Sequence, residues 1–386
     1  MGSEWKEFEL GQLLDVVTDI YKPNKNEVLP YLGLEHIEQG TLRLSGIGMS
    51  TDIISNKYRF EPNDILFGKL RPYFRKVYKP RFSGVCSTDI MVLRTKDCNI
   101  ADQSFLFYVI ASKKFIDIAT ASSKGTKMPR ADWNHLKKVM IKLPPLPEQQ
   151  KIASILSAFD DKIELNNEMN KTLEEIAQAI FKHWFIDFEF PNENGEPYKS
   201  SGGEFVDSEL GPIPKGWKVG FLGEIIDITS GKRPLSRSNE KDMEHRVPLV
   251  GASSIMGYVK EVLYNEPIII IGRVGTLGVV QRYSEPIWAS DNTLVIKSSS
   301  YEYVYQLLKL LDYSSLNRGS TQPLLTQNDI KNLSIAIPVE DILHKFEELS
   351  SSIYRKVQCN KKENDILSQL RDTLLPKLIS GEIRVM

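Results

Sequence analysis

The chain has 386 residues, of which 41% are hydrophobic and 26% are charged, and its formal net charge is -1. This length exceeds a typical single domain, and the composition is that of a folded globular protein. The near-zero net charge does not by itself indicate a nucleic-acid binder. No run of eighteen apolar residues and no charged leader before an apolar stretch is present, so we expect neither a membrane span nor a signal peptide. Three scattered cysteines favour a reducing, cytoplasmic location over a disulfide framework.

The sequence contains an internal repeat. Trp5-Lys6 and Leu10-Gly11 recur as Trp217-Lys218 and Leu222-Gly223, at an offset of 212. Further matches join Gly68-Lys69 to Gly272-Arg273, Ser87-Thr88-Asp89 to Ala289-Ser290-Asp291, Gly125-Thr126 to Gly319-Ser320, and Ile141, Leu143 and Pro144 to Ile335, Ile337 and Pro338. Self-similarity of this kind indicates two copies of one structural unit. Each copy ends in a long helical pattern.

Within each copy, short β-rich runs alternate with helical periodicity. We predict strands at Ile90–Arg94, Val139–Leu143, Pro267–Ile271, Thr293–Ile296 and Leu333–Ile337, and helices at Gln103–Ala119 and Tyr301–Leu311. Residues 187–212 are rich in Pro, Gly, Asn and Ser, and we interpret them as the linker between the copies. The predicted domains are 1–146 and 213–338, the helical regions are 147–186 and 339–379, and the tail is 380–386.

The two helical regions predict an antiparallel coiled coil. From Pro147-Glu148 onward, apolar residues recur in alternating steps of four and three, which is the pattern of a heptad seam. Asn166 and Asn170 interrupt this seam, and at an offset of 194 the second helix carries Asn360 and Asn364. Antiparallel pairing brings Asn166 opposite Asn364 and Asn170 opposite Asn360. Such pairs set the register of helix packing; the alternative is that duplication left them on a solvated flank.

The fold class that we predict is therefore α+β. Two tandem, pseudo-twofold-related α/β domains would be separated by two long helices that form the coiled coil, a rod of roughly 50 Å at 1.5 Å per residue. A twofold protein on duplex DNA contacts half-sites separated by about 34 Å or a multiple of it. A rod of this size would suit that role.

Local charge points to the same kind of partner. Residues 57–82 hold eight basic residues against two acidic ones, with aromatic residues interleaved, whereas 148–189 hold four lysines against nine acids. Basic side chains neutralise phosphates and arginine reads guanine, although a merely solvated basic face is the plainer alternative. The candidate DNA-binding residues are Lys69, Arg71, Arg75, Lys127 and Arg130 in the first copy, and Lys232, Arg233, Arg237, Arg273 and Gln322 in the second.

Motifs of catalysis and of metal binding are missing from the sequence. We find no P-loop, no G-x-G-x-x-G after a strand, no H-E-x-x-H, no Cys-x-x-Cys and no amino-methyltransferase [DNS]-P-P-[FYW] motif, and the five histidines are isolated. Asp160-Asp161 is expected to lie on a solvated helix face. We therefore predict that the chain has no catalytic residues and no metal ligands. A stand-alone DNA-modifying enzyme with an unrecognised motif, and a dumbbell that binds proteins alone, remain the alternatives.

Several segments resemble the specificity (S, HsdS) subunits of type I restriction-modification systems. They are DILFGKLRPYFRKV at 64–77, LPPLPEQQKIASILSAFDDKIELNN at 143–167, HWFIDFEF at 183–190, GEFVDSELGPIPKGW at 203–217 and LLPKLISGEIRV at 374–385. The resemblance covers almost the whole chain. The sequence departs from it at the start of the second helix, where PVEDILHKF replaces the proline-glutamine pattern.

The resemblance implies a non-catalytic subunit. Each mixed domain would be a target recognition domain that reads half of a bipartite, asymmetric site in double-stranded DNA, and the helices would act as a ruler between the halves. Two methyltransferase (M) subunits would dock on the helical regions, for which we pick Phe181, Trp184 and Phe185 as contacts, and restriction (R) subunits would complete the complex. S-adenosylmethionine, ATP and Mg would be bound by these partner subunits, and this chain would bind no cofactor.

Overall fold

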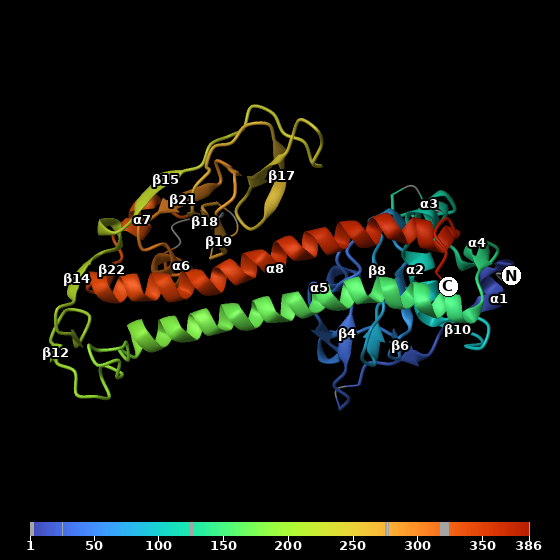
Figure 1. Cartoon of the computed structure of the whole chain (residues 1–386), viewed down its shortest axis with the longest axis horizontal. Helices are drawn as coiled ribbons and strands as arrows, with labels where there is room; N and C mark the ends of the chain where they lie inside the picture. Colours follow the sequence, from blue (N-terminus) through green and yellow to red (C-terminus); the bar gives the residue numbers. More distant parts are fainter. Residues whose placement is uncertain are drawn as a thin grey trace. The chain divides into compact units, whose positions relative to one another are not determined.

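The computed structural model describes residues 4–24, 26–123, 125, 127–274, 276, 278–316 and 324–385. The chain divides into two compact units (Figure 1). Unit 1 comprises Met1–Asn167 and Lys361–Met386, and unit 2 comprises Glu168–Asn360. The boundary between them falls inside both long helices, so each unit contains one mixed domain together with part of each helix.

Unit 1 contains three sheets. A two-stranded sheet joins β1 (Lys6–Glu9) to β11 (Met140–Leu143). A four-stranded sheet has the order β2 (Leu14–Val17), β10 (Ile90–Thr95), β7 (Ile65–Gly68) and β8 (Val77–Tyr78). A five-stranded sheet has the order β3 (Ile20–Tyr21), β6 (Lys57–Phe60), β9 (Gly84–Cys86), β4 (Pro30–Leu32) and β5 (Gly48–Met49).

Unit 2 repeats this arrangement, with three strands in place of five in its third sheet. Its two-stranded sheet joins β14 (Lys218–Phe221) to β22 (Ser334–Ile337). The four-stranded sheet has the order β15 (Asp227–Ser230), β21 (Thr293–Lys297), β18 (Ile268–Gly272) and β19 (Val280–Tyr283). A three-stranded sheet has the order β17 (Ile255–Val259), β16 (Val247–Val250) and β20 (Trp288–Ala289). The predicted α+β class and all five predicted strands are confirmed.

The strand registers show how the two copies align. Lys6 pairs with Leu143 in unit 1, and Lys218 pairs with Ile337 in unit 2, at the expected offsets of 212 and 194. One predicted alignment was wrong by a single residue. Gly68 pairs with Ile90 and Gly272 pairs with Thr293, so Ser87-Thr88-Asp89 matches 290–292 and not 289–291. The pairing of the strands fixes which residues are equivalent, whereas the similarity of three small or polar residues was too weak to fix it.

Short helices alternate with the strands along the sequence of each domain. Unit 1 has α1 (Leu10–Leu13), α2 (Gln103–Ala111), α3 (Lys113–Ala121) and α4 (Trp133–Leu136), and unit 2 has α6 (Tyr301–Leu310) and α7 (Gln327–Lys331). Short 3-10 turns are η1 (Leu34–His36), η2 (Ser50–Asp52), η3 (Pro72–Phe74) and η5 (Leu222–Glu224). The single helix predicted at 103–119 is two helices. Ser112 has an extended backbone, ends α2, and caps α3 by accepting a hydrogen bond from the Phe115 N–H.

Two long helices pack against each other within each unit (Figure 1). They are α5 (Leu146–Phe181), which a π turn (η4, Lys182–Ile186) continues, and α8 (Glu340–Ser380). In unit 1, Ile152 and Leu156 share an apolar core with Leu375 and Leu378. In unit 2, Leu173 and Trp184 of the first helix pack in the core that contains Val357 and Phe346 of the second. In both units the residue numbers of the partners run in opposite directions, which confirms antiparallel pairing.

The connection between the copies, 187–212, is a folded segment and not an open linker. Phe190 is buried and stacks on Trp217 and on Tyr198. The Tyr198 N–H donates to the Phe190 carbonyl over 2.9 Å, and β12 (Phe205–Val206) pairs with β13 (Ile213–Pro214). Aromatic burial therefore orders a stretch whose composition indicated flexibility.

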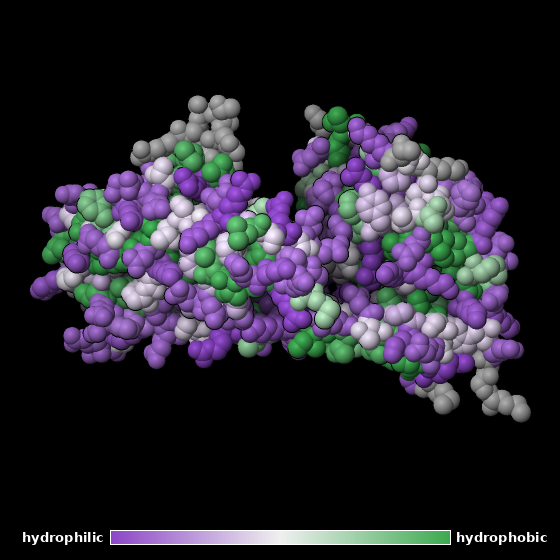
Figure 2. All heavy atoms as spheres, turned by 90° about the horizontal axis from the view of Figure 1, so that it is seen from above, coloured by the Kyte–Doolittle hydropathy of each residue, from purple (hydrophilic) through white to green (hydrophobic). Residues whose placement is uncertain are grey.

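On the face drawn in Figure 2, hydrophilic residues predominate and hydrophobic residues form scattered patches. The largest clusters of buried hydrophobic residues lie where the sheets meet the helices, one in each unit. None of the helices in the described part of the chain combines the length and the apolarity needed to cross a membrane.

Candidate nucleic-acid interface

One turn is built in the same way in both units and carries a cation in each. The Lys69 N–H donates to the Asp89 carbonyl over 2.9 Å, and the Lys69 carbonyl accepts from Ala131 over 2.9 Å. At the equivalent position, the Arg273 N–H donates to the Asn292 carbonyl over 2.8 Å, and its carbonyl accepts from Leu325 over 2.9 Å. The repeat therefore places Lys69 and Arg273 in equivalent backbone frames.

The glycine that precedes each cation is required by close packing. A Cβ added at Gly68 would lie 2.8 Å from Leu34 Cδ2 and 3.1 Å from the Lys76 carbonyl oxygen. A Cβ at Gly272 would lie 2.2 Å from the Thr276 carbonyl oxygen, well inside van der Waals contact. A side chain at position 272 would displace the neighbouring backbone, and one at position 68 would displace the Leu34 side chain and crowd the Lys76 carbonyl. This explains why the Gly-Lys and Gly-Arg pairs recur in the sequence.

In unit 1 the turn gathers three of the predicted DNA-binding residues. Lys69 and Arg130 line one groove of about 390 Å³, together with Tyr58, Asp132 and Trp133. Arg71 lies two residues after Lys69, and its backbone is in the left-handed region, at φ 50°. The Arg71 N–H donates to the Pro129 carbonyl over 2.8 Å. A non-glycine residue at positive φ is uncommon and costs conformational energy. The backbone of Arg71 is therefore strained where it contacts the loop that contains Lys127. Lys127 itself is exposed.

Arg130, which lines this groove, is held by an acidic neighbour, Asp89. Its Nε donates to Asp89 Oδ1 over 3.0 Å, and this hydrogen bond raises the pKa of Arg130. Lys69 makes no side-chain hydrogen bond or ion pair within the described residues. Contact with a phosphate would therefore compete with Asp89 for Arg130, whereas Lys69 is available without such competition.

The basic segment 57–82 is not the free cationic patch that its composition suggested. Most of its side chains are used inside unit 1: Arg59 binds Glu27 at 2.9 Å, Lys76 donates to the Leu34 carbonyl at 2.5 Å, Lys79 donates to Ser104 at 2.8 Å, and Arg81 pairs with Asp161. Arg75 donates to the Ala111 carbonyl at 2.7 Å and to Asp372 at 3.4 Å. Its guanidinium is thus committed to α2 and α8, and we remove Arg75 from the candidate interface.

In unit 2, two of the predicted cations line a pocket of about 560 Å³. Arg233, Arg237 and Asn292 line it together with Ser290, a buried residue whose hydroxyl has no hydrogen-bond partner among the described residues. Neither of these two arginines pairs with another described residue. The segment that leads to them is anchored by Lys232, whose N–H donates to the Ala289 carbonyl over 2.9 Å and whose carbonyl accepts from Trp288 Nε1 over 2.7 Å.

Of the two other DNA-binding residues predicted in unit 2, the structure describes Arg273 but not Gln322. Arg273 Nη1 donates to Ser230 Oγ over 3.5 Å, while its buried Nε has no hydrogen-bond partner in the part of the chain that the structure describes. Gln322 and the Gly319-Ser320 loop lie outside the described residues. Lys232 and Arg273 therefore follow the ends of β15 and β18, the two strands that flank β21, and Arg233 and Arg237 lie in the loop after β15.

The residues picked as partner contacts are core residues instead. Phe181 and Phe185 are 1% and 6% exposed, and their rings pack on Tyr303 and Phe346, with centroid separations from 4.8 to 5.8 Å. Trp184 packs on Phe346 at 6.0 Å. Their apolar surface is already buried inside unit 2, so a partner subunit cannot use the two phenylalanines. The domain that covers these residues is distant from them in sequence, so the helical pattern alone does not show their burial.

Both asparagine pairs are present in the structure, one in each unit. In unit 1, Asn166 Nδ2 donates to Asn364 Oδ1 over 2.9 Å and also to Glu363, and Asn364 Nδ2 donates to Asn167 Oδ1. In unit 2, Asn360 Nδ2 donates to Asn170 Oδ1 over 2.9 Å. All four paired asparagines are 7% exposed or less. The predicted partners are therefore correct, and a shift of register would separate buried amides.

The expectation that Asp160-Asp161 is a solvated face was wrong for Asp160. Asp160 Oδ1 accepts from Arg371 Nη1 at 2.5 Å, and Oδ2 accepts from the Tyr108 hydroxyl at 2.6 Å. Arg371 is 2% exposed although it occupies a seam position. In the heptad pattern of the second helix, Arg371 interrupts the apolar seam. A buried cation needs an anion, so its place in the seam was the signal that an acidic partner lay opposite.

A second buried cluster in unit 2 was also missed. Arg282 pairs with the 4%-exposed Glu302 at 2.6 Å, and its guanidinium lies 3.6 Å from the ring centroid of Tyr354. Burial raises the pKa of Glu302 to about 7, although Arg282 opposes the shift. No signal in the local sequence marks this cluster. Within the described residues, no group of three His, Cys, Asp or Glu side chains could hold a metal ion.

Comparison with known proteins identifies the family. The family model described as "Type I restriction modification DNA specificity domain" matches residues 2–175 and 214–378. The chain is 34% identical to the MjaIX specificity subunit of Methanocaldococcus jannaschii, over 73% of this chain and 69% of that one. It is 25% identical to the HindI specificity subunit of Haemophilus influenzae, over 99% and 100%.

A solved structure supports the fold. The type I restriction-modification S subunit from M. genitalium aligns over 97% of this chain and 96% of that one, with a TM-score of 0.57 and 20% identity. Two matches to the specificity domain in tandem agree with the two copies seen in the strand registers. The chain belongs to the family of type I restriction-modification specificity subunits.

Proposed function

We propose that this chain reads a bipartite, asymmetric site in double-stranded DNA, one half with each recognition domain, and carries out no catalysis itself. The observation that carries the proposal is the turn shared by the two units, which presents Lys69 in one and Arg273 in the other on the same backbone frame. We assign the recognition domains to residues 1–146 and 213–338, and the helical regions to 147–186 and 339–379. The segment 187–212 connects them, and 380–386 is the tail.

The side chains around the shared turn differ between the units, which would make the two half-sites different. Unit 1 offers Lys69, Arg71, Lys127 and an Arg130 tethered to Asp89, whereas unit 2 offers Lys232, Arg233, Arg237 and Arg273 beside a polar pocket. Lysines supply phosphate neutralisation, and arginines can also pair bidentately with guanine in the major groove. The DNA-binding residues that we propose are these eight.

We further propose that the coiled-coil pairing fixes the spacer between the half-sites. Asn166 and Asn364 in unit 1, and Asn170 and Asn360 in unit 2, hold the register that this function requires. Seven residues inserted into each helix should lengthen the preferred spacer by roughly 10.5 Å, or about 3 base pairs. The preferred spacer is measured by mapping methylated sites in the assembled complex. An unchanged spacer would contradict the ruler.

Two methyltransferase subunits would dock on the chain and bring restriction subunits with them. These partners would bind S-adenosylmethionine, ATP and Mg, in keeping with the membership of this chain in a specificity-subunit family. Because Phe181 and Phe185 are buried, we place the methyltransferase contacts on the solvent-facing residues of the helical regions. Such a complex acts on the chromosome of a cell, so we propose a cytoplasmic location.

The proposal is tested with the purified full chain and with the reconstituted complex. The chain should bind a duplex with its cognate half-sites, and the affinity should fall steeply as salt rises, because phosphate neutralisation releases counterions. Labelled S-adenosylmethionine should transfer methyl groups to DNA once methyltransferase subunits are added. Methyl transfer by the chain alone would overturn the non-catalytic assignment, and salt-independent or absent DNA binding would overturn the recognition assignment.

A further inference from the structure

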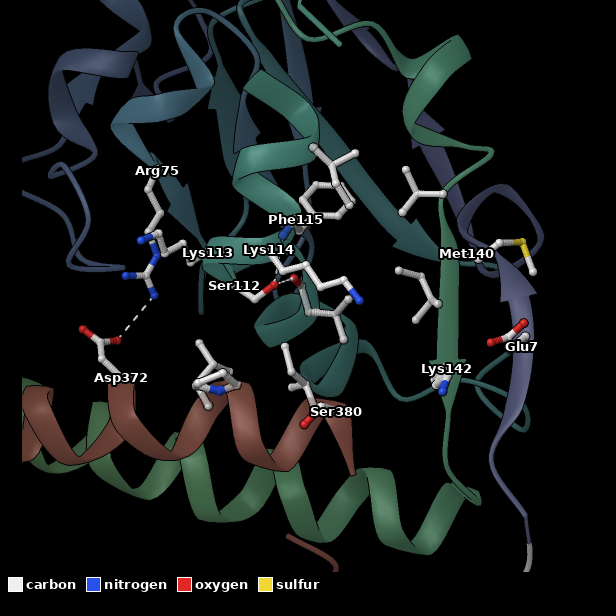
Figure 3. Close-up of a pocket in the computed structure, with 17 residues that line it drawn as sticks. Glu7, Arg75, Ser112, Lys113, Lys114, Phe115, Met140, Lys142, Asp372 and Ser380 are labelled. Atoms are coloured by element: carbon white, nitrogen blue, oxygen red, sulfur yellow. Dashed lines mark hydrogen bonds and ion pairs between the residues drawn. The ribbon is translucent and has the colours of Figure 1, made fainter. Parts of the chain in front are cut away.

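Unit 1 contains a cavity of about 650 Å³ that the reading of DNA does not use (Figure 3). Its walls are α3, strand β11 and the last turns of α8, and Arg75 and Asp372 close one side with their ion pair. This volume is within the range of ligand-binding clefts. The cavity lies apart from the Lys69–Arg130 groove, and no residue lines both.

The floor of the cavity is apolar and its rim is cationic. Aliphatic and aromatic side chains form the floor: Val109, Phe115, Ile118, Ile141, Leu375 and Ile379. Three exposed lysines stand around it, Lys113 and Lys114 on α3 and Lys142 on β11 (Figure 3). None of the three pairs with another described residue, and Asp372 is already bound by Arg75 and Arg371. The charged residues of the lining are then four cations, Arg75 and the three lysines, against two carboxylates, Glu7 and Asp372, so positive charge is in excess.

One wall of the cavity is an open strand edge. β11 pairs with β1 in a sheet of two strands, and in Figure 3 the lining residues of α3 lie on the side of β11 away from β1, while Glu7 of β1 also lines the cavity. In the described part of the chain, no strand pairs with this second edge. Opposite it, Pro376 has no N–H to donate to the carbonyl of Asp372, so a backbone acceptor on α8 also lacks its helical partner.

We propose that this cavity binds an extended, acidic segment of a partner protein. Its backbone would add a strand to the free edge of β11, which spans four residues or roughly 13 Å. Apolar side chains at alternate positions would enter the floor, and carboxylates would meet Lys113, Lys114 and Lys142. A strand edge is a wall for which a peptide, and not a small organic acid, supplies the complementary hydrogen bonds.

The site belongs to unit 1 and not to its repeat. At an offset of 194, the positions of Leu375 and Ile379 are occupied by Phe181 and Phe185, which fill the core of unit 2. The position of Lys142 is occupied by Ala336. The repeat thus replaces cavity-lining aliphatic residues with rings and removes a cation. We therefore expect one partner segment per chain, bound on the unit 1 side.

The test uses the full chain and a fluorescent seven-residue peptide of alternating glutamate and valine. We expect the peptide to raise fluorescence anisotropy, and the triple variant K113E/K114E/K142E to weaken its binding at least tenfold. Ile379→Phe, which introduces the residue found in unit 2, should fill the floor and weaken binding without changing charge. Lys138→Glu, at an exposed lysine outside the cavity, is the matched control and should bind normally. A peptide with lysine in place of glutamate should not bind.

Hydrogen exchange separates strand addition from loose adsorption. Amides of Met140–Leu143 should exchange more slowly when the peptide is bound, and melting temperatures should show that each variant is folded. Peptide binding by the triple variant equal to wild type, or no added protection in β11, would overturn the proposal. Full displacement of the peptide by octanoate would also overturn it, because a small acid would then be the better occupant. DNA affinity should be unchanged in all these variants, so failure here leaves the recognition proposal intact.

Discussion

In both units a hydrogen bond joins the mixed domain to a long helix at equivalent positions, but different side chains make it. In unit 1 the Tyr108 hydroxyl of α2 donates to Asp160 of α5 over 2.6 Å. In unit 2, Gln306 of α6 donates through Nε2 to the Tyr354 hydroxyl of α8 over 2.7 Å. These residues are equivalent at offsets of 198 and 194. The hydrogen bond between domain and helix is kept while both side chains are replaced.

Each unit also buries an arginine beside this hydrogen bond, and the two arginines are stabilised differently. Arg371 comes from α8 and is held by Asp160, Asp372 and the Thr41 carbonyl. Arg282 comes from β19, lies against the ring of Tyr354, and pairs with Glu302. Within the described residues, one guanidinium nitrogen of Arg282 and one carboxylate oxygen of Glu302 have no hydrogen-bond partner. Unit 1 therefore depends on a satisfied ion network, and unit 2 depends on rings around a less satisfied pair.

The largest effect should come from breaking the network in unit 1. Asp160→Ala leaves Arg371 buried with only part of its partners, and we expect a loss of about 3 kcal/mol in the free energy of unfolding, at the low end of the cost for a broken buried pair. Urea denaturation measures it. Asp161→Ala, which removes an exposed partner of Arg81, is the matched control and should cost less than about 1 kcal/mol. Equal losses for the two variants would show that the network is not stabilising.

The second prediction concerns the pH dependence of unit 2. Burial raises the pKa of Glu302 from its usual value of 4.5 to about 7, so the folded state binds this proton more tightly than the unfolded state does. The contribution of Glu302 to stability is then fully present below pH 4.5 and is lost as the pH rises through 7. Glu302→Gln should remove this dependence, which amounts to up to about 3 kcal/mol.

The measurement is the free energy of unfolding of wild type and Glu302→Gln at pH 5 and pH 8. Wild type should lose stability relative to the variant between these values. Glu347, whose pKa burial also raises, is present in both proteins, so its contribution cancels to first order. A constant difference across the range would show that Glu302 stays ionised in its pair with Arg282.

The third prediction compares the two asparagine pairs. Asn166→Leu leaves the carbonyl of Asn364 without its donor and should cost about 1–2 kcal/mol, whereas the double variant N166L/N364L should be near neutral because both amides are gone. Asn170→Leu should lower the stability of unit 2 by a similar amount, because it removes the acceptor of the single hydrogen bond between Asn360 and Asn170. Replacing all four with leucine should stabilise the helices and broaden the spacer preference of the assembled complex. A sharp preference in that variant would mean that the register is set elsewhere.

The helix register could be predicted from sequence because it depends on a repeating local pattern. Asn166 and Asn364 occupy seam positions that the heptad spacing alone defines, and the second copy supplied the partner. The state of each cation could not be predicted in this way. Whether Arg59 or Arg75 is free depends on Glu27 and on the Ala111 carbonyl, which lie 32 and 36 residues away in the chain. The same limit hid the burial of Phe181 and Phe185.

The smallest effect, and the one that bears most directly on function, separates free cations from committed ones. Lys69→Ala and Arg273→Ala each remove a side chain from the shared turn, and each should weaken DNA binding by about 1 kcal/mol and lower the salt slope by about 1. Arg75→Met is the matched control, because its guanidinium is bound to Ala111 and Asp372 and faces the cavity of unit 1. Titrations at several salt concentrations measure both quantities.

If Arg75→Met weakened DNA binding as much as Lys69→Ala, the count of basic residues in 57–82 would be the better guide to the interface. The structure argues otherwise. Positive charge that is already neutralised by a carboxylate or spent on a carbonyl cannot release counterions from DNA without breaking that contact first. The two equivalent turns, each with one cation on a glycine-dependent frame, are therefore the positions at which loss of a single charge should register in the salt slope.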